Sequence, residues 1–425
     1  MSTVAMQEPA KPLDVAWVRR QFPSLQLQVH GHPAAFLDGP AGTQVPQQVI
    51  DAMREYFSQA NANTCGAFLT SRRTDEMLAG ARSAMADFVH SAPEEISFGP
   101  NMTTITFALA RAIGRELKPG DEIGVTTLDH DANVAPWRAL EEKGVVVRQA
   151  DIRERDCTLD LEDLRRKITP KTKLVAVGYA SNAVGSINPV AEITKLGHEA
   201  GALVFVDAVH YAPHGPIDVK ALDCDFLACS PYKFFGPHMG VLYGKKEHLL
   251  RFRPYKVRPA PDALPDRWET GTQTHEGIAG IAAAVEYLAG VGRHCDSFPK
   301  TRREALLAAY RATAAHECGL VTKLIAGLLE IPGLTFYGIR DPQRFAERCS
   351  TVSVRLAKGT PVDAAKFLGD RGIFTWDGNF YALNLTERLG VQEKGGLLRI
   401  GLVHYNTAEE VDRLLAGLRE FAEGA

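Results

Sequence analysis

The sequence lacks the features that mark several classes of protein. Its 425 residues contain no run of about 18 apolar residues, so no transmembrane helix is expected. The first residues, MSTVAMQEPAKPLD, have neither the basic start nor the apolar stretch of a signal peptide. An excess of one charge is also missing, because 48 Lys and Arg residues stand against 51 Asp and Glu residues. We therefore expect a cytoplasmic protein whose main partner is neither nucleic acid nor a membrane.

Cysteine is scarce, and its spacing indicates no ordered framework. The seven cysteines form no C-x-x-C pair and no paired Cys/His spacing, so neither a disulfide framework nor a metal site is expected. The hydrophobic fraction of 45% and the charged fraction of 23% are ordinary for a globular protein. A chain of this length can bury a core without a disulfide or a metal, and roughly two or three domains are expected.

Short apolar runs alternate with amphipathic helical patterns between about residues 95 and 245. Seven strands are predicted, at Glu95–Phe98, Glu122–Thr126, Val145–Ala150, Leu174–Tyr179, Leu203–Val206, Phe226–Cys229 and Gly240–Tyr243. Helical patterns lie between several of them, for example at 134–143, 161–167 and 190–200. This alternation predicts an α/β fold whose mostly parallel sheet is covered on both faces. In such folds ligands bind at the carboxyl ends of the strands.

Beyond about residue 275 the pattern changes to long helices followed by a mixture of strands and helices. Helices are predicted at 277–288, 301–329, 362–370 and 408–421, and strands at 352–356, 374–376, 381–383 and 397–402. The mixture predicts a smaller α+β domain. We therefore divide the chain into an N-terminal arm or short helix (1–35), a large domain (36–290) and a small C-terminal domain (291–425) that includes part of the N-terminal segment.

An acid and a lysine end two successive predicted strands. Asp207 follows the run ALVFV, and Lys233 follows the next strand within SPYKFFG. Asp207 alone could be a helix cap or turn residue, and most lysines are solvated. The aromatic neighbours of Lys233 favour burial, which lowers the pKa of an amine and makes it a good nucleophile. The pair fits pyridoxal phosphate, because Lys233 could hold its aldehyde and Asp207 could keep its pyridine nitrogen protonated.

Three other features meet the demands of that cofactor. The segment Gly99–Thr104 opens a helix after a strand and suits a phosphate cradle. His130 ends another strand and could stack on the ring. Arg399 lies in the apolar run LLRIG and could grip a substrate carboxylate. Each feature has an ordinary structural alternative: a capped helix start, a surface histidine and a buried ion pair.

In the order and spacing of eight segments the chain resembles the class V aminotransferase family of fold-type I pyridoxal-phosphate enzymes, in particular its cysteine desulfurase-like branch. From about residue 36 to 420 the segments are FLDGPAGTQVP, SFGPNMTT, LDHDANVAPW, SNAVGSINP, VFVDAVH, SPYKFFGPHMGVLYG, RWETGTQT and LLRIGLVHYNTAEEVDRLL. The resemblance implies pyridoxal 5'-phosphate as cofactor and a large domain on a seven-stranded, mostly parallel sheet with a small α+β domain. It also implies a homodimer with active sites at the interface.

The resemblance assigns roles to the residues that match the family's motifs. Lys233 would bind the cofactor covalently, Asp207 would pair with the pyridine nitrogen, and His130 would stack on the ring. The phosphate would be held by Met102 (through its backbone), Thr103, Ser230 and, from the neighbouring subunit, Thr272. His210 stands where relatives often have a Gln that touches the ring oxygen, Tyr232 replaces a His before the lysine, and Asn182 would lie near the substrate carboxylate or the ring hydroxyl. Arg399 would bind the α-carboxylate of the substrate.

One departure from the family concerns the nucleophile of the desulfurases. Those enzymes carry a reactive Cys on a C-terminal loop, where this chain has Tyr381, and often an Arg where it has Trp376. A tyrosine cannot carry a persulfide, because that step requires a thiolate. Cys65 and Cys349 are the only thiols that we expect near the cleft. We expect Tyr381 and Trp376 to border the substrate.

Four functions are compatible with these residues. The leading hypothesis is a pyridoxal-phosphate enzyme that acts on a small amino acid by β-elimination, as a C–S lyase without a persulfide cysteine. A class V aminotransferase and a true cysteine desulfurase are the enzymatic alternatives. A sensor that kept the fold without catalysis is disfavoured, because Asp207 and Lys233 are both present and no DNA-binding domain is apparent.

Overall fold

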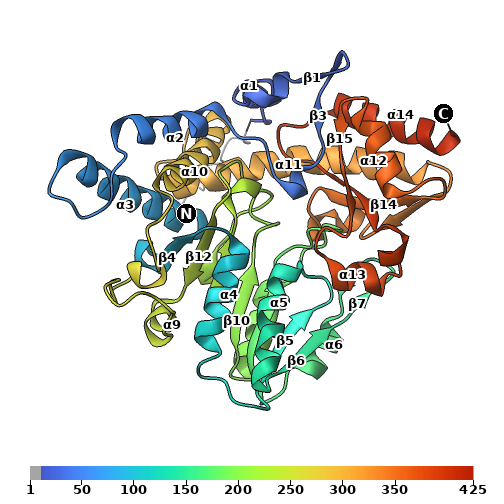
Figure 1. Ribbon diagram of the computed structural model, residues 1–425. Helices are drawn as coiled ribbons and strands as arrows, with labels where there is room; N and C mark the ends of the chain where they lie inside the picture. Colours follow the sequence, from blue (N-terminus) through green and yellow to red (C-terminus); the bar gives the residue numbers. More distant parts are fainter. Residues whose placement is uncertain (1–10, 425) are drawn as a thin grey trace, which may run out of the picture.

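The computed structural model describes residues 11–424 and is built around a seven-stranded sheet (Figure 1). In spatial order the strands are β4 (Ile96–Gly99), β12 (Gly240–Gly244), β11 (Phe226–Cys229), β10 (Leu203–Asp207), β9 (Thr172–Gly178), β5 (Glu122–Thr126) and β6 (Val146–Ala150). Neighbouring strands are parallel except where β12 pairs with β11 and β4. The seven predicted strands and the mostly parallel α/β fold are confirmed.

Successive residues of the central strands point into two separate cores, one on each face of the sheet. On β9, Val175 and Val177 belong to one cluster of buried side chains, while Leu174 and Ala176 belong to another. The first cluster includes buried residues of the helices α3 (Leu69–Val89), α7 (Val190–Glu199), α10 (His275–Cys295) and α11 (Arg302–Leu329). The second includes buried residues of α4 (Met102–Ile113), α5 (Ala135–Arg138) and α9 (Lys246–Arg251). Burial on both faces explains why these strands read as continuous apolar runs.

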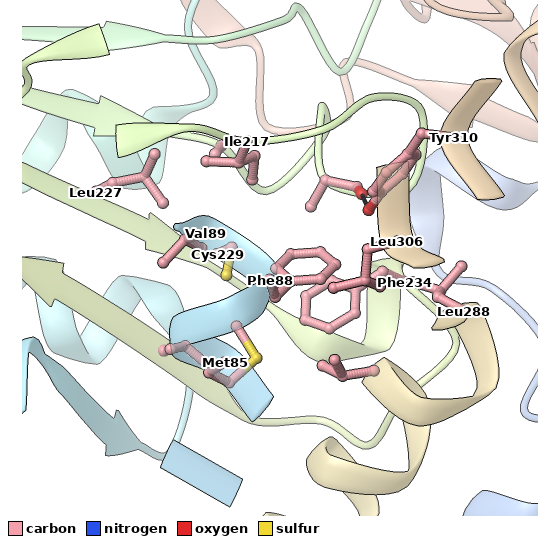
Figure 2. Packing of buried hydrophobic residues seen from close by; sticks show 14 of the residues in the cluster. Met85, Phe88, Val89, Ile217, Leu227, Cys229, Phe234, Leu288, Leu306 and Tyr310 are labelled. Atoms are coloured by element: carbon pink, nitrogen blue, oxygen red, sulfur yellow. Dashed lines mark hydrogen bonds between the residues drawn. The ribbon is translucent and has the colours of Figure 1, made fainter. Parts of the chain in front are cut away.

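The first core reaches the predicted lysine segment directly (Figure 2). The rings of Phe88 on α3 and Phe234, the residue after Lys233, are stacked with centroids 4.6 Å apart. Both side chains are buried. Because close-packed interiors resist rearrangement, this stacking fixes the backbone next to the lysine.

A second sheet occupies the C-terminal part of the chain and is antiparallel throughout. Its order is β13 (Leu334–Tyr337), β14 (Thr351–Leu356), β17 (Leu397–Gly401) and β16 (Trp376–Gly378). The helices packed against it are α11, α12 (Pro361–Gly369) and α14 (Ala408–Glu423). The four predicted helices beyond residue 275 and the strands at 352–356 and 397–402 are confirmed, with ends that differ by a few residues.

The predicted strand at 381–383 is wrong. Phe380 and Tyr381 have φ values of 57° and 58°, in the left-handed region that no strand adopts. The side chain of Asn379 accepts a hydrogen bond from the Tyr381 N–H, which closes a turn, and the chain then enters α13 (Leu383–Arg388). The predicted strand at 374–376 is divided between β16 and β15 (Ile373–Phe374), which pairs with β3 (Ala35–Phe36).

The N-terminal segment packs onto the rest of the protein. Helix α1 (Val15–Arg20) is capped by Asp14, whose side chain accepts a hydrogen bond from the Trp17 N–H. The buried residues Val18 and Phe22 join the first core. The strands β1 (Gln28–Val29) and β2 (His32–Pro33) and the helix α2 (Gln47–Gln59) follow. Residues 1–10 of the predicted arm lie outside the described residues, and the division at 35 and 290 stays a prediction.

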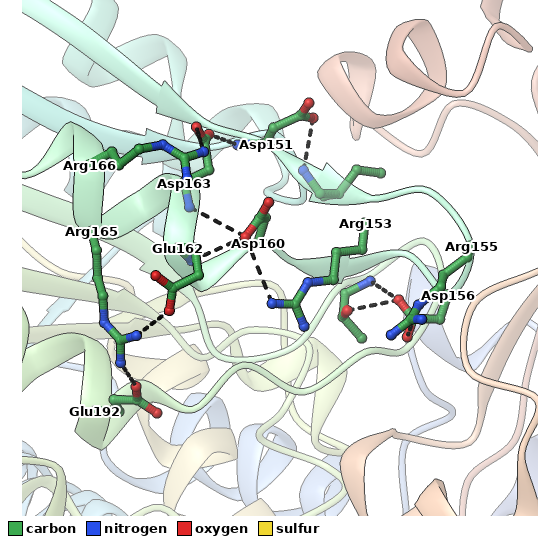
Figure 3. Close-up of polar contacts among 12 residues, drawn as sticks. Asp151, Arg153, Arg155, Asp156, Asp160, Glu162, Asp163, Arg165, Arg166 and Glu192 are labelled. Carbon is green, nitrogen blue, oxygen red and sulfur yellow. Dashed lines mark hydrogen bonds and ion pairs between the residues drawn. The ribbon is translucent and has the colours of Figure 1, made fainter.

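A charged surface region surrounds the predicted helix at 161–167, which is confirmed as α6 (Leu161–Lys167) (Figure 3). The Asp160 side chain caps it by accepting hydrogen bonds from the N–H groups of Glu162 and Asp163. Arg165 joins α6 to Glu192 of α7 through an ion pair of 2.5 Å. The small hairpin β7 (Ile152–Arg153) and β8 (Thr158–Leu159) lies beside it, and α8 (Val219–Leu222) precedes β11. None of the helices in residues 11–424 has the length and apolar character of a membrane span.

Candidate active site

A cavity opens at the carboxyl ends of the parallel strands. Nine of the predicted site residues line it, and they are Met102, Thr103, His130, Asn182, Asp207, His210, Ser230, Tyr232 and Lys233. They follow β4, β5, β9, β10 and β11, so a side chain at the end of each of these strands reaches the same space. The predicted residues therefore meet at the edge of the sheet where ligands bind in such folds.

Lys233 is a buried amine held in an apolar setting. It ends a 3₁₀ turn, Pro231–Lys233, and is followed by the fully buried Phe234 and Phe235. Burial lowers the pKa of Lys233 to about 7, and the charge of Arg399 acts in the same direction. Its Nζ donates a hydrogen bond to the carbonyl oxygen of Pro40. A substantial fraction of the amine is therefore neutral near pH 7 and able to attack a carbonyl carbon.

Asp207 is a buried carboxyl group with no basic side chain bonded to it among the described residues. Its Oδ1 accepts one hydrogen bond, from the Val209 N–H at 2.9 Å. Burial raises the pKa of Asp207 to about 6, despite that hydrogen bond and the charge of Lys233. A cationic N–H placed against this carboxylate would lower the cost of its burial.

His130 presents a neutral ring to the cavity. Burial lowers its pKa to about 4, helped by the charges of Lys233 and Arg399. Its Nδ1 accepts a hydrogen bond from the Ala132 N–H at 3.0 Å, which orients the imidazole. A flat, neutral ring in this position suits stacking on an aromatic ligand.

Asp129 lines the same cavity and was missed at the sequence level. Its Oδ1 accepts a hydrogen bond from the Gly178 N–H at 2.7 Å, so it ties the segment that holds His130 to the end of β9. Burial raises the pKa of Asp129 to about 8. In the sequence, Asp129 resembles an ordinary loop residue. What distinguishes it is its contact with Gly178, and a single sequence does not indicate that contact.

The N-terminus of α4 forms one wall of the cavity. Asn101 caps the helix by accepting a hydrogen bond from the Thr104 N–H at 2.8 Å. Met102 and Thr103 lie in the first turn of the helix, where no helical carbonyl oxygen is placed to accept from their N–H groups. These N–H groups are therefore free to bind an anion. Gly240 passes close beneath, where a Cβ atom would come within 2.5 Å of the Asn101 backbone. Ser230 lines the same cavity and could supply a hydroxyl.

Arg399 is a buried guanidinium group without a bonded carboxylate. Its Nη1 donates to the carbonyl oxygen of Asn182 at 2.9 Å, and its Nε has no partner among the described residues. Burial lowers the pKa of Arg399 to about 9, although the nearby Asp38 opposes the shift. The structural alternative, a hydrogen-bonded ion pair, is therefore not what the side chain makes. An incoming carboxylate would satisfy it.

Aromatic side chains cover the mouth of the site. The Tyr381 ring stacks on His130 with centroids 5.3 Å apart, and 72% of the residue is exposed. The guanidinium of Arg399 lies over the Phe380 ring, 4.2 Å from its centroid. Trp376 is half-exposed and stands opposite Arg399 in the pairing of β16 with β17. Phe380 was missed because its place depends on the left-handed turn.

Three predicted residues lie apart from this cavity within one chain. Thr272 and Cys65 line a different hollow, together with residues of α3 and the segment before α10. Cys349 is buried, and its Sγ lies within 4.8 Å of ring nitrogens of His210 and His214. Neither thiol lines the cavity that contains Lys233. Cys224 and Cys229 are buried core residues.

The residues present fit pyridoxal phosphate as a group. Lys233 offers the amine, Asp207 a bare buried acid, His130 a flat ring and the start of α4 an anion cradle. Arg399, which could bind a carboxylate, is connected to this cavity by its hydrogen bond to Asn182, which lines it. The individual roles of these residues stay predictions.

Comparison with known proteins gives matches over almost the whole chain. The Aminotransferase class-V family model matches residues 35–414. A cysteine desulfurase from Dickeya dadantii (strain 3937) is 33% identical over 430 residues, covering 97% of this chain and 98% of that protein. A probable cysteine desulfurase from Halalkalibacterium halodurans is 33% identical over 422 residues, covering 96% of this chain and 97% of that protein. Among solved structures, the apo cysteine desulfurase from Thermococcus onnurineus NA1 has a TM-score of 0.86 at 29% identity, covering 99% of this chain and 100% of its own. A cysteine desulfurase from Escherichia coli has a TM-score of 0.82 at 27% identity, covering 96% of this chain and 98% of its own.

Proposed function

Because this chain belongs to the class V aminotransferase family and is a pyridoxal-phosphate enzyme, we propose that it is a cysteine desulfurase-like C–S lyase. Its substrate is a small amino acid with a leaving group on the β-carbon, such as cysteine. The reaction is a β-elimination that releases the leaving group to solvent, without passing sulfur to a cysteine of the enzyme. The relatives named cysteine desulfurases support the substrate class.

The observation that carries this proposal is that no thiol lines the cavity. The residues around Lys233 include none of the seven cysteines. Burial raises the pKa of Cys157 to about 12 and also raises the pKa values of Cys224, Cys229 and Cys349. These buried thiols stay protonated near pH 7 and are poor acceptors of sulfur. The exposed Cys65 and Cys318 lie outside the cavity.

Two hydrogen bonds hold the loop that carries Tyr381 in place, which supports the proposal that the enzyme passes no sulfur to a residue of its own. The Asp131 N–H donates to the carbonyl oxygen of Tyr381 at 2.7 Å. The Asn182 side chain donates to the carbonyl oxygen of Phe380 at 2.8 Å. A residue that delivered sulfur to an acceptor would have to move away from the cavity. Hydrogen bonds at Phe380 and Tyr381 hold this loop in place instead.

We assign the binding roles as follows. The first amides of α4 with Ser230 hold the phosphate, and His130 stacks on the ring. Asp207 keeps its carboxylate against the pyridine nitrogen. Tyr232 and His210 border the ring, and Thr272 reaches the phosphate of a second subunit. Arg399 binds the α-carboxylate of the substrate, with Asn182 beside it.

The residues of the chain then perform the proton chemistry. When bound, pyridoxal phosphate supplies an electron sink that stabilises negative charge at the α-carbon of the substrate. Lys233 Nζ accepts the α-proton, since burial leaves much of this amine neutral near pH 7. Asp207 would stabilise the positive charge of the protonated pyridine nitrogen. Arg399 fixes the substrate by its carboxylate, so that the α-proton faces the lysine.

A product screen tests this function. We would incubate the reconstituted protein with cysteine and other β-substituted amino acids, with and without a 2-oxo acid. The expected products are pyruvate, ammonia and the leaving group, independent of the oxo acid. Lys233→Ala should lose turnover and the visible absorbance of the bound cofactor, whereas Lys246→Ala, at a lysine whose side chain is 57% exposed, should keep both.

Each alternative predicts a different outcome of that screen. Amine transfer that requires the oxo acid would mean an aminotransferase. Alanine with sulfide from cysteine, abolished by replacing one cysteine, would mean a true desulfurase. A colourless protein that cannot be reconstituted would contradict the enzymatic assignment and leave the sensor.

We also propose a homodimer in the cytoplasm that binds neither nucleic acid nor membranes. Apolar side chains that are exposed in the single chain support the dimer, because such groups usually mark a contact surface. Four of them lie on α2 and the start of α3, namely Ile50, Phe57, Phe68 and Leu69. The near balance of charge supports the absence of an anionic partner.

A further inference from the structure

A cluster of metal-ligating side chains lies behind the wall of the cavity. His210, His214 and Cys349 each offer one ligand atom, and the three atoms lie within 4.8 Å of one another. The two imidazoles follow β10 and are four residues apart, with ring centroids separated by 5.4 Å. Cys349 comes from the segment before β14 and is far away in sequence, so cysteine and histidine spacing could not indicate this group.

The ring nitrogens of the two histidines are set up for a ligand. His214 Nδ1 bonds to Glu317 Oε2 at 2.7 Å, and its Nε2 makes no hydrogen bond among residues 11–424. Ser350 Oγ donates to the same carboxylate oxygen at 2.7 Å. Metal-bound histidines commonly hold a carboxylate on their other nitrogen, which orients the ring. The side chain of His214 is 5% exposed, so this orientation is fixed by burial.

Two buried polar atoms here have no hydrogen-bond partner among the described residues. They are His210 Nε2 and Glu317 Oε1. An unpartnered buried polar atom is costly and rare in a native fold. Glu317 also has no Lys or Arg within ion-pair distance among residues 11–424. A cation bound beside His210 and His214 would satisfy the first atom and offset the buried carboxylate charge.

We propose that His210, His214 and Cys349 bind a zinc ion. Two imidazoles and a thiolate are ligands that zinc prefers, and a water molecule would complete a tetrahedral site. Zinc bonds of about 2.0–2.3 Å place ligand atoms roughly 3.5 Å apart, so the three groups must approach by about 1 Å. Cys349 gives up its thiol proton to solvent on binding. The ion would fix the position of the His210 ring, which lines the cavity that contains Lys233.

Metal analysis of the full-length, untagged holoenzyme tests this site. After zinc loading and dialysis, we expect about one zinc per chain in the wild type. Cys349→Ser and His214→Gln should each lose at least nine-tenths of that zinc. Cys318→Ser, at an exposed cysteine on α11, is the matched control and should keep it. A wild type with less than one-tenth of a zinc per chain would overturn the proposal, as would variants that retain the metal.

Cobalt substitution keeps the proposal testable if the variants fold poorly. Cobalt(II) added to the metal-free wild type should produce the intense absorption of a thiolate–cobalt bond and the weaker bands of a tetrahedral ion. The wild type is expected to saturate at about one cobalt per chain, and zinc should displace it. Cobalt binding without the thiolate absorption would exclude Cys349 as a ligand and refute the site as proposed.

Discussion

Two buried cationic side chains belong to the candidate site: Lys233 lines the cavity, and Arg399 bonds to Asn182, which also lines it. Burial lowers the pKa values of both groups, and the charge of Arg399 lowers the pKa of Lys233 further. Arg399 keeps its charge, because its pKa of about 9 is well above neutral pH. Lys233 sits close to its titration point. Arg399 is thus a permanent cation that could bind a carboxylate, whereas Lys233 gains or loses its charge near neutral pH.

The rate of cofactor attachment should follow the titration of Lys233. Only the neutral amine attacks the aldehyde, so the rate should rise roughly tenfold per pH unit below about pH 7 and level off above it. Stopped-flow absorbance after mixing apoprotein with pyridoxal phosphate measures this. Arg399→Gln should move the midpoint to higher pH, because it removes a positive charge, while Arg399→Lys should move it less. A midpoint near pH 10 in the wild type would contradict a desolvated amine.

Residues that end strands could be predicted from the sequence, and residues placed by loop packing could not. Asp207 and Lys233 follow apolar runs, so their position at one sheet edge follows from the strand order alone. Asp38, Asp129 and Phe380 reach the site through contacts between distant segments. Asp38 is buried with a pKa raised to about 6 by that burial, yet in the sequence it is one acid among many.

At the scale of whole elements, the apolar runs predicted all seven strands of the large sheet. Because these strands are buried on both faces, they consist almost entirely of apolar residues and stand out in the sequence. The small domain was harder to predict. Its sheet is solvated in part, and its strands are interrupted by turns such as the one at Phe380 and Tyr381. The helices α2 and α3 lie in a segment for which we predicted no elements.

Asp225, the residue just before β11, connects several elements of the large sheet and of the helices packed on it. Burial alone would raise its pKa, but hydrogen bonds from His248, His198 and the Val204 N–H, with the charge of Lys245, hold the pKa well below its usual range. Its side chain is 3% exposed. The carboxylate therefore links β11 to β10, α7 and α9.

Asp225→Asn should lower the free energy of unfolding by about 3 kcal/mol near pH 7, because it leaves buried donors without their charged partner. A depressed carboxyl pKa contributes stability above its unfolded value of about 3.9 and loses it as pH falls further. The difference between wild type and variant should therefore shrink below about pH 4. Urea denaturation at several pH values measures it.

Asp223→Asn is the control for that experiment. Asp223 also pairs with Lys245, yet its side chain is 66% exposed, and exposed ion pairs contribute at most about 1 kcal/mol. Equal losses in the two variants would contradict the structural role of Asp225.

At the scale of the whole molecule, one surface is unusually apolar for a single chain. Phe57 at 55% exposure and Phe68 at 57% lie at the end of α2 and just before α3. A groove between α2, α3 and α10 runs beside them and is lined largely by alanines and apolar atoms. In the homodimer that we propose, a second copy of the chain would cover this surface.

Replacing Phe57 and Phe68 by Asp should convert the dimer to monomers, because two charges would be buried in the contact. Sedimentation velocity at micromolar concentration measures the change. Leu250→Asp, at a residue of α9 that is 49% exposed, should leave the dimer intact. If the double variant still sediments with the wild type, the contact surface lies elsewhere.

The residues that line the cavity all fall between Asn101 and Lys233, a single continuous stretch of the chain. Arg399, which we propose binds the substrate carboxylate, lies instead near the end of the chain. On the ribosome the chain emerges at about 5–20 residues per second, so Arg399 is made roughly 10–30 seconds after Lys233. The whole lining of the cavity is therefore synthesised well before the residue that we propose to bind the substrate carboxylate.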